Sequence, residues 1–203
     1  MNYPDKTNTG LRVWELALLI SLCFSLCLGA WAQARQAAVS SGLIRLHVIA
    51  ASDDPAEQEL KLRVRDAVLT ELEPKLASAD TRDEAQSILR RELESICRAA
   101  GSVSEGREIA VQLGEEYYPT RHYEGFSLPA GRYTSLRVTV GKGEGHNWWC
   151  VVFPPLCVSA AECEKALDGM DNGTRRLICD GEGRVIRFRI VELWGELTEK
   201  LRA

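Results

Sequence analysis

The sequence predicts an α/β protein of the α+β type, with a mixed, largely antiparallel sheet packed against two or three helices and preceded by an N-terminal signal helix. Three observations lead to this class: short β-rich runs, two amphipathic helical stripes after the first run, and one apolar stretch near the N-terminus. The chain has 203 residues, of which 27% are charged and 45% hydrophobic, as in ordinary globular domains. This composition excludes long-range disorder and collagen-like repeats.

The N-terminal segment has the pattern of an export signal. Residues 16–28, LALLISLCFSLCL, are apolar apart from two serines, and the basic residues Lys6 and Arg12 precede them. Ala30 and Ala32 supply the small residues of an A-x-A cleavage site. The apolar core is shorter than the about 20 residues that a membrane span needs, which favours a signal peptide.

This pattern sets the expected domain organisation. Residues 1–32 are expected to be a signal peptide, and residues 33–203 a single exported domain. The alternative is an uncleaved anchor, which would contact the membrane only through residues 11–32. Export also makes disulfide bonds permissible among the cysteines of the exported part.

The first predicted strand and two helices follow the signal. Residues 43–50 form a β-rich run bounded by turn formers, which predicts a strand. Asp54, Pro55 and Glu57 then supply an N-cap, a proline at the first helical position and a capping-box glutamate, and a second capping box at Thr81–Glu84 opens another helix. The predicted inward-facing residues are Leu60, Val64, Ala67, Val68 and Leu72 in the first helix and Ala85, Ile88, Leu89, Leu93 and Ile96 in the second.

The second half of the domain reads as strands and turns. Alternating polar and apolar residues predict strands at 108–113 and 133–140. The apolar run at 147–153, which Pro154-Pro155 ends, predicts another strand. Residues 117–123 are expected to form an aromatic loop, and the glycine-rich residues 141–145 a hairpin turn between the last two strands. Residues 159–167 fit a short helix, and residues 184–191 fit either a last strand or part of a terminal helix.

Charge and residue spacing exclude several classes of function. A net charge of -4 argues against a nucleic-acid binder, which usually carries a basic surface. The three histidines, His47, His122 and His146, do not have metal-ligand spacing, and the cysteines after the signal form no C-x-x-C pair. Residues 141–145 lack the lysine and the following helix that a phosphate-binding loop needs. We therefore predict no metal and no cofactor.

The cysteines suggest a structural bond more than a catalytic one. Cys150 and Cys157 flank the diproline Pro154-Pro155, whose bend brings the two side chains toward bridging distance, so we expect a disulfide between them. Two reduced, buried thiols are the alternative. A thiol nucleophile at Cys150 with His146 or His122 is formally possible, but an apolar mid-strand position disfavours the thiolate. No catalytic residue is predicted.

Trp148 and Trp149 stand in the most aromatic segment of the exported part. Neighbouring side chains of a strand point to opposite faces, so one tryptophan can fill the core while the other needs a second layer, a ligand or a partner. An exposed aromatic residue beside a rigid turn is typical of protein–protein contacts. Packing of both tryptophans against the predicted helices is the alternative.

Several blocks of the sequence resemble the stage II sporulation protein R family. In chain order they are residues 43–69 (LIRLHVIAASDDPAEQELKLRVRDAVL), 118–121 (YPTR), 128–133 (LPAGRY), 136–138 (LRV) and 145–157 (GHNWWCVVFPPLC). Together they extend over more than half of the chain. The pattern NWWC…FPPLC is specific by itself.

The resemblance implies a signalling protein for communication between two cells of an endospore-forming bacterium. Such proteins are secreted from the forespore into the intermembrane space of the sporulation septum. There they activate a membrane-embedded aspartic protease of the mother cell, the sigma-E processing peptidase of the stage II sporulation protein GA type. This protease then removes the pro-sequence of pro-sigma-E.

With this role, we expect activation by binding and no enzymatic step. A ligand activates its target only through higher affinity for the active state. The expected partner-binding residues are Trp148, Trp149, Pro154 and Pro155, with Tyr118 and Arg121 of the aromatic loop and His47 of the first strand. The alternatives are an exported cysteine-dependent or cell-wall hydrolase and a wall-associated binding module.

Overall fold

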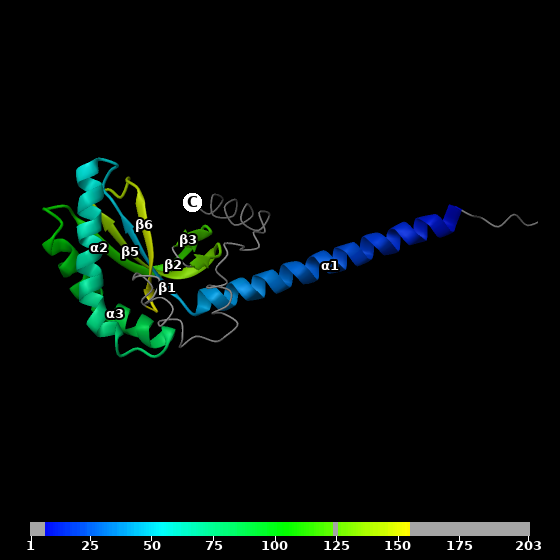
Figure 1. The fold of residues 1–203 in the computed structure, drawn as a ribbon, viewed down its shortest axis with the longest axis horizontal. Helices are drawn as coiled ribbons and strands as arrows, with labels where there is room; N and C mark the ends of the chain where they lie inside the picture. The colour runs from blue at the N-terminus through cyan, green and yellow to red at the C-terminus, as the bar shows by residue number, and fades with distance from the viewer. Residues whose placement is uncertain (1–6, 124–125, 155–203) are drawn as a thin grey trace, which may run out of the picture. The chain divides into compact units, whose positions relative to one another are not determined.

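A computed structural model gives the fold of residues 7–123 and 126–154. The chain divides into two compact units, with the boundary after Ala37. The elements in chain order are α1 (Thr7–Ser41), β1 (Ile44–Ile49), α2 (Pro55–Leu76), α3 (Arg82–Ser102), β2 (Ile109–Tyr118), β3 (Arg121–Tyr123), β4 (Phe126–Leu128), β5 (Gly131–Val140) and β6 (Asn147–Phe153) (Figure 1).

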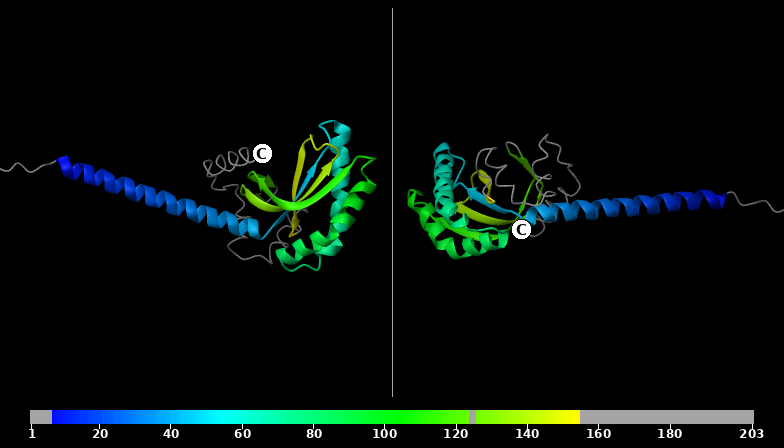
Figure 2. Two further views of the ribbon diagram at one scale, coloured as in Figure 1. Left: turned by 180° about the vertical axis from the view of Figure 1, so that it is seen from behind. Right: turned by 60° about the horizontal axis from the view of Figure 1, so that its bottom comes forward.

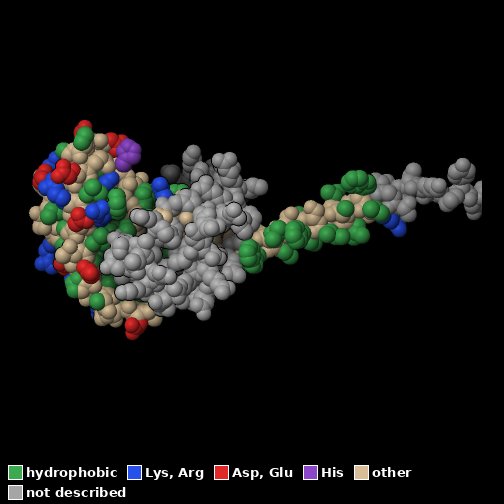
Figure 3. All heavy atoms as spheres, viewed as in Figure 1, with side chains coloured by type: hydrophobic (Ala, Val, Ile, Leu, Met, Phe, Trp, Pro, Cys, Tyr) green, Lys and Arg blue, Asp and Glu red, His purple; other side chains and the backbone are tan. Residues whose placement is uncertain are grey.

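The N-terminal unit is a single apolar helix, and its surface is dominated by hydrophobic side chains (Figure 3). The segment Arg12–Ser41 is long and apolar enough to cross a membrane, with a mean hydropathy of 2.0. This helix is compatible with the predicted signal peptide. It runs without a break past the predicted cleavage site at Ala32. Cleavage there, and the alternative of a retained anchor, stay predictions.

The second unit is built on a four-stranded sheet with the strand order β2-β5-β1-β6. Strand β1 is parallel to β5 and antiparallel to β6, and β2 is antiparallel to β5. Helices α2 and α3 cover one face of the sheet, and the two-stranded β3–β4 hairpin lies on the other (Figures 1 and 2). The predicted α+β class, with a mixed and largely antiparallel sheet, is confirmed.

The larger hydrophobic core lies between the sheet and the two helices, on what we call the helix face. Alternate residues of the strands supply one side of it, and the apolar stripes of α2 and α3 supply the other. Its buried members are Ile44, Leu46 and Val48 of β1, Leu136, Val138 and Val140 of β5, Cys150 and Val152 of β6, Leu60, Val64, Val68, Leu72 and Leu76 of α2, and Ala85, Leu89, Ile96 and Ala100 of α3. Most predicted stripe residues are among them, whereas Ala67, Ile88 and Leu93 are only partly buried.

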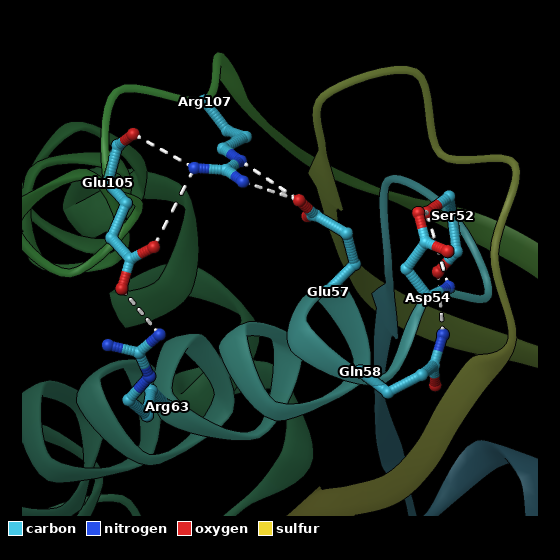
Figure 4. Close-up of polar contacts among 7 residues, drawn as sticks. All are labelled: Ser52, Asp54, Glu57, Gln58, Arg63, Glu105 and Arg107. Carbon is cyan, nitrogen blue, oxygen red and sulfur yellow. Dashed lines mark hydrogen bonds and ion pairs between the residues drawn. The ribbon is translucent and has the colours of Figure 1, made fainter.

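The start of α2 differs from the predicted capping box (Figure 4). Asp54 is the N-cap and Pro55 stands at the first helical position, but the Asp54 side chain makes no capping hydrogen bond. It accepts a hydrogen bond from Ser52 Oγ at 3.1 Å, and the Glu57 carboxylate instead pairs with Arg107 at 2.5 Å. Stronger partners have therefore replaced the capping contacts. The box that Thr81 and Glu84 form at the start of α3 is confirmed.

The predicted hairpin turn at residues 141–145 is wrong. Strands β5 and β6 are not neighbours, because β1 lies between them. The linker crosses the end of β1, where Gly145 N–H donates to the Ala50 carbonyl at 2.9 Å and Glu144 N–H donates to the Ala51 carbonyl at 3.3 Å. The physical reason is burial: every residue of β1 is buried, so the strand takes a central position with both of its faces covered.

The predicted aromatic loop at residues 117–123 is also corrected. Tyr117 and Tyr118 end a β2 strand that is longer than predicted, and residues 121–123 form β3. Tyr118 is fully buried, which explains why this segment is ordered as a strand. The predictions for residues 159–167 and 184–191 lie outside the described residues.

The crossing linker provides a stability prediction. A Cβ atom at Gly145 would lie 2.2 Å from the Ser52 carbonyl oxygen, whereas one at Gly114 in β2 would meet no atom within 4 Å. Because the backbone at Ser52 must shift, Gly145→Ala should reduce the free energy of unfolding by about 3 kcal/mol. Urea unfolding measures this loss, and Gly114→Ala is the matched control with a change below about 0.5 kcal/mol. Equal stabilities of the two variants would contradict the close approach.

Candidate functional site

The candidate site lies on the sheet face opposite α2 and α3, which we call the aromatic face. The strand register sets its side chains out in rows across the sheet. One row is Gln112 on β2, Arg137 on β5, His47 on β1 and Trp149 on β6, and the next is Gly114, Ser135, Arg45 and Val151. A central strand that is buried on both faces therefore carries an arginine and a histidine among apolar residues.

Arg45 is fully buried inside a cage of tyrosines. Its guanidinium carbon lies 4.2 Å from the Tyr118 ring centre and 5.2 Å from that of Tyr133. Its Nε donates to the Cys150 carbonyl at 3.1 Å, and its Nη2 donates to the Tyr123 hydroxyl at 2.6 Å. Within the described part of the chain Arg45 forms no ion pair, and its Nη1 has no hydrogen-bond partner. Cation–π contacts and carbonyl dipoles therefore stabilise this charge.

A second polar group centres on the carboxylate of Glu116. His47 Nδ1 lies 3.1 Å from Glu116 Oε2, Ser135 Oγ donates to the same oxygen at 2.6 Å, and Arg137 Nε lies 2.6 Å from Oε1. The Tyr118 hydroxyl lies 2.6 Å from Ser135 Oγ and extends the network. Burial by itself would raise the pKa of Glu116, but the hydrogen bonds to His47 and Ser135 and the electrostatic effects of His47 and Arg137 lower it overall.

The tyrosines of this face stay protonated. Burial raises the pKa of Tyr118, Tyr123 and Tyr133 above its ordinary value of 10, and the nearby Arg45 charge only partly opposes this effect. The three hydroxyl groups therefore remain neutral hydrogen-bonding groups at physiological pH.

Trp149 forms the wall of the site. Its ring stacks on His47, with 4.2 Å between ring centres and 13° between planes, and Tyr118 meets it edge-on at 4.6 Å. On this face Arg121 of β3 places its guanidinium carbon 5.2 Å from the Trp149 ring centre. Three of the predicted partner-binding residues, His47, Tyr118 and Arg121, are thus brought together around Trp149.

A groove of about 820 Å³ runs along the edge strand β2 next to this stack. Its lining includes His47, Glu116, Ser135, Arg137 and Trp149 from the aromatic face, together with residues 111–117 and Leu93 of α3. Gly114 forms part of its floor, and no atom lies within 4 Å of the position that its Cβ would take. A glycine inside a strand often marks a place where another chain or a ligand approaches closely.

The other predicted residues lie apart from this group. Trp148 points to the helix face, as the predicted alternation requires; it is 36% exposed, and the Arg65 guanidinium carbon lies 4.5 Å from its ring centre. Pro154 is buried and follows a cis peptide bond. Pro155 lies outside the described residues. Trp148 and Trp149 therefore belong to two different surfaces.

The structure does not assemble the thiol site considered from the sequence. Cys150 is disulfide-bonded, while the other described cysteines, Cys23, Cys27 and Cys97, are free. Cys157 lies outside the described residues, so its pairing with Cys150 stays a prediction.

The exposed His146 does not serve the thiol site either. Its Nδ1 pairs with Asp53, and this contact lowers the pKa of the Asp53 carboxyl. No thiolate–imidazole pair forms among the residues that the structure describes.

The network around Glu116 also differs from a nucleophilic triad. In such a triad the base accepts the proton of the serine and is oriented by the acid on its other nitrogen. Here Ser135 donates directly to the acid, and His47 Nε2 lies 3.0 Å from Asn147 Oδ1. Among the described residues, no group of three or more acidic, histidine or cysteine side chains could hold a metal ion.

Comparison with known sequences identifies the family. Residues 40–163 match the family described as stage II sporulation protein R. The chain belongs to this family. The matched range contains β1 to β6 and thus every residue of the aromatic face described above.

A curated relative agrees with this assignment. Stage II sporulation protein R of Bacillus subtilis (strain 168) is 37% identical over 118 residues, which cover 56% of this chain and 53% of that protein. The match thus spans about half of the length of the relative. No solved structure matches the chain.

Sequence reasoning missed several members of the site, among them Arg45, Gly114, Glu116, Tyr133, Ser135 and Arg137. A signal for Arg45 was present, because a charged residue in the middle of an apolar strand must either break the strand or be bonded internally. Glu116 and Arg137 could be paired only after the register of β2 and β5 was known. Gly114 lies just beyond the strand predicted at residues 108–113, and no pattern in the sequence singled it out.

The Glu116 network predicts a pH-dependent stability. The pKa of Glu116 in the folded protein lies below the ordinary value of 4.5. The contribution of its carboxylate to the free energy of unfolding is therefore complete above pH 4.5 and is lost as the pH falls through the lower, folded-state pKa. Glu116→Gln should therefore cost about 2 kcal/mol at pH 7 and much less at pH 3. Urea unfolding at both pH values measures the gap, and Glu115→Gln, at an exposed neighbouring position, should leave stability unchanged. If Glu116→Gln reduced the free energy of unfolding by the same amount at both pH values, the stabilising role of the Glu116 carboxylate would be contradicted.

Proposed function

We propose that this protein is an exported sporulation signal that activates a membrane-embedded aspartic protease of the mother cell and so triggers processing of pro-sigma-E. Its membership of the stage II sporulation protein R family carries the proposal. The apolar helix α1 supports export, and the bonded state of Cys150 suits an oxidising compartment. The intermembrane space of the septum, facing the mother cell, is the proposed location.

The groove beside Trp149 is the proposed docking surface. It combines features common at protein interfaces: a large aromatic side chain, arginines, and a hollow next to an edge strand. A segment of the protease that fills this hollow would bury the exposed part of Trp149. Activation follows if this contact is available only in the active conformation of the protease, since binding shifts an equilibrium through differential affinity.

Processing in non-sporulating cells tests the function directly. Cells that carry the protease and pro-sigma-E should show processed sigma-E only when this protein is present and exported, as measured by immunoblot. A variant without residues 1–32 should be inactive, because it stays on the wrong side of the membrane. If all partners are present and this protein is folded outside the membrane, absence of processing would contradict the proposed function.

A filled groove tests the docking surface. Gly114→Phe adds a ring where the structure leaves open space, so the protein should fold while the groove is blocked. We expect processing to fall at least about tenfold, as for the loss of a central interface contact. Gly101→Phe is the matched control, because Gly101 is exposed on α3 and also has no atom within 4 Å of its Cβ position.

Two results would separate stability from binding. Thermal unfolding should give similar midpoints for the two glycine variants, and only Gly114→Phe should fail to signal. A Gly114→Phe protein that is exported and signals normally would place docking elsewhere, with the exposed Trp148 surface as the next candidate. Trp149→Ala is a poorer test, because removal of a packed aromatic ring itself costs about 3–5 kcal/mol.

A further inference from the structure

Two arginines of the aromatic face, Arg45 and Arg121, lie near Tyr123 and have no carboxylate partner in the described part of the chain. Arg121 is exposed, and its guanidinium group lies against the face of Trp149. Arg45 is fully buried, and its Nη1 has no hydrogen-bond partner among the described residues. By contrast, Arg137 on the same face is paired with Glu116.

Tyr123 connects the two guanidinium groups. Its hydroxyl accepts from Arg45 Nη2 at 2.6 Å and donates to the Trp149 carbonyl at 3.3 Å. The charges of Arg45 and Arg121 both act on this tyrosine and oppose the rise in its pKa that burial causes. Both cations therefore act on the same small region beside the Trp149 ring.

This arrangement has the chemistry of a carboxylate receptor. A guanidinium held against an aromatic face keeps its fork of N–H donors oriented, and such a fork fits the two oxygens of a carboxylate. The buried Arg45 adds positive potential that no carboxylate in the described part of the chain neutralises, and a low-dielectric surrounding makes this potential stronger than in water. An acidic side chain that reaches Arg121 would thus be held by a direct contact and by the field of Arg45.

We propose that Arg121 binds an aspartate or glutamate side chain of the partner polypeptide, seated on the edge of Trp149. This proposal rests on the proposed function and names the chemistry of the segment that docks there. A single exposed arginine among aromatic rings fits one carboxylate better than an extended anionic surface. The net charge of -4 also disfavours attraction to anionic lipid or to a phosphate-rich polymer.

Charge reversal at Arg121 tests this assignment in the full chain. In the processing assay, Arg121→Glu should reduce sigma-E processing by more than about tenfold, because two carboxylates then face each other. Arg121→Gln should reduce it less, and Arg121→Lys should keep part of the activity, since lysine retains the charge but not the fork. Arg98→Glu, at an exposed position on α3, is the matched control with the same charge change and should signal normally.

A compensating change in the partner identifies the contact. Acidic residues of the protease that face the same compartment are replaced one at a time by arginine, each with Arg121→Glu present. One of these replacements should restore processing, and the same replacement should impair signalling by the unaltered protein. Because Arg121 is exposed, thermal unfolding of Arg121→Glu should match that of the unaltered protein.

The possible failures are distinguishable. If the unaltered protein triggers no processing, the proposed function itself fails. If the unaltered protein and Arg121→Glu trigger processing equally, only the carboxylate contact is overturned. Binding of the purified protein to phosphatidylglycerol vesicles that is lost in Arg121→Glu, with processing unchanged, would assign Arg121 to a membrane surface and also overturn the proposal.

Discussion

The buried charge of Arg45 constrains most of the aromatic face. A guanidinium in the centre of a sheet is costly unless its donors and its charge are compensated internally. Here the compensation comes from aromatic rings and carbonyl groups instead of a carboxylate, which requires Tyr118, Tyr133 and Tyr123 at defined distances. Tyr118 is the last residue of β2, Tyr133 lies near the start of β5, and Tyr123 belongs to the β3–β4 hairpin. One side chain thus brings together three segments that are distant in the sequence.

The two polar groups of this face, around Glu116 and around Arg45, differ in how their charges are compensated. Around Glu116, one carboxylate receives hydrogen bonds from Ser135 and His47 and an ion pair from Arg137, so its charge is fully compensated. Around Arg45, most of the donors are hydrogen-bonded, but no carboxylate in the described part of the chain pairs with the positive charge. The first group therefore acts as a structural support for Trp149 and β2. The second group has a positive charge that an acidic residue of a partner can neutralise.

Local patterns predicted the elements well and their connections poorly. The β1 run, the stripes of α2 and α3 and the capping box at Thr81 depend on neighbouring residues, and these predictions hold. The Asp54–Glu57 capping box failed because Arg107, distant in sequence, provides a stronger partner for Glu57. The hairpin at 141–145 failed for a similar reason, because the position of β1 between β5 and β6 is a property of the whole sheet.

The candidate site was predictable only in part, for the same physical reason. Period-two alternation correctly separated Trp148 from Trp149, and the aromatic segment drew attention to Trp149 and Arg121. It could not show that Trp149 lies beside His47, because cross-strand neighbours depend on register. Nor could it show that Arg45, a residue of an apolar strand, sets the charge of the face on which these residues meet.

Strand β6 contributes side chains to both faces of the sheet. Val151 and Trp149 face the aromatic side, while Trp148, Cys150 and Val152 face the helices. In the described sheet, β6 pairs on one side only, with β1, so its own ladder restrains it less than that of a central strand. The Cys150 carbonyl anchors Arg45, and the Cys150 sulfur is tied in a disulfide. The disulfide thereby supports the strand that presents Trp149, so its formation contributes to the geometry of the proposed docking surface as well as to stability.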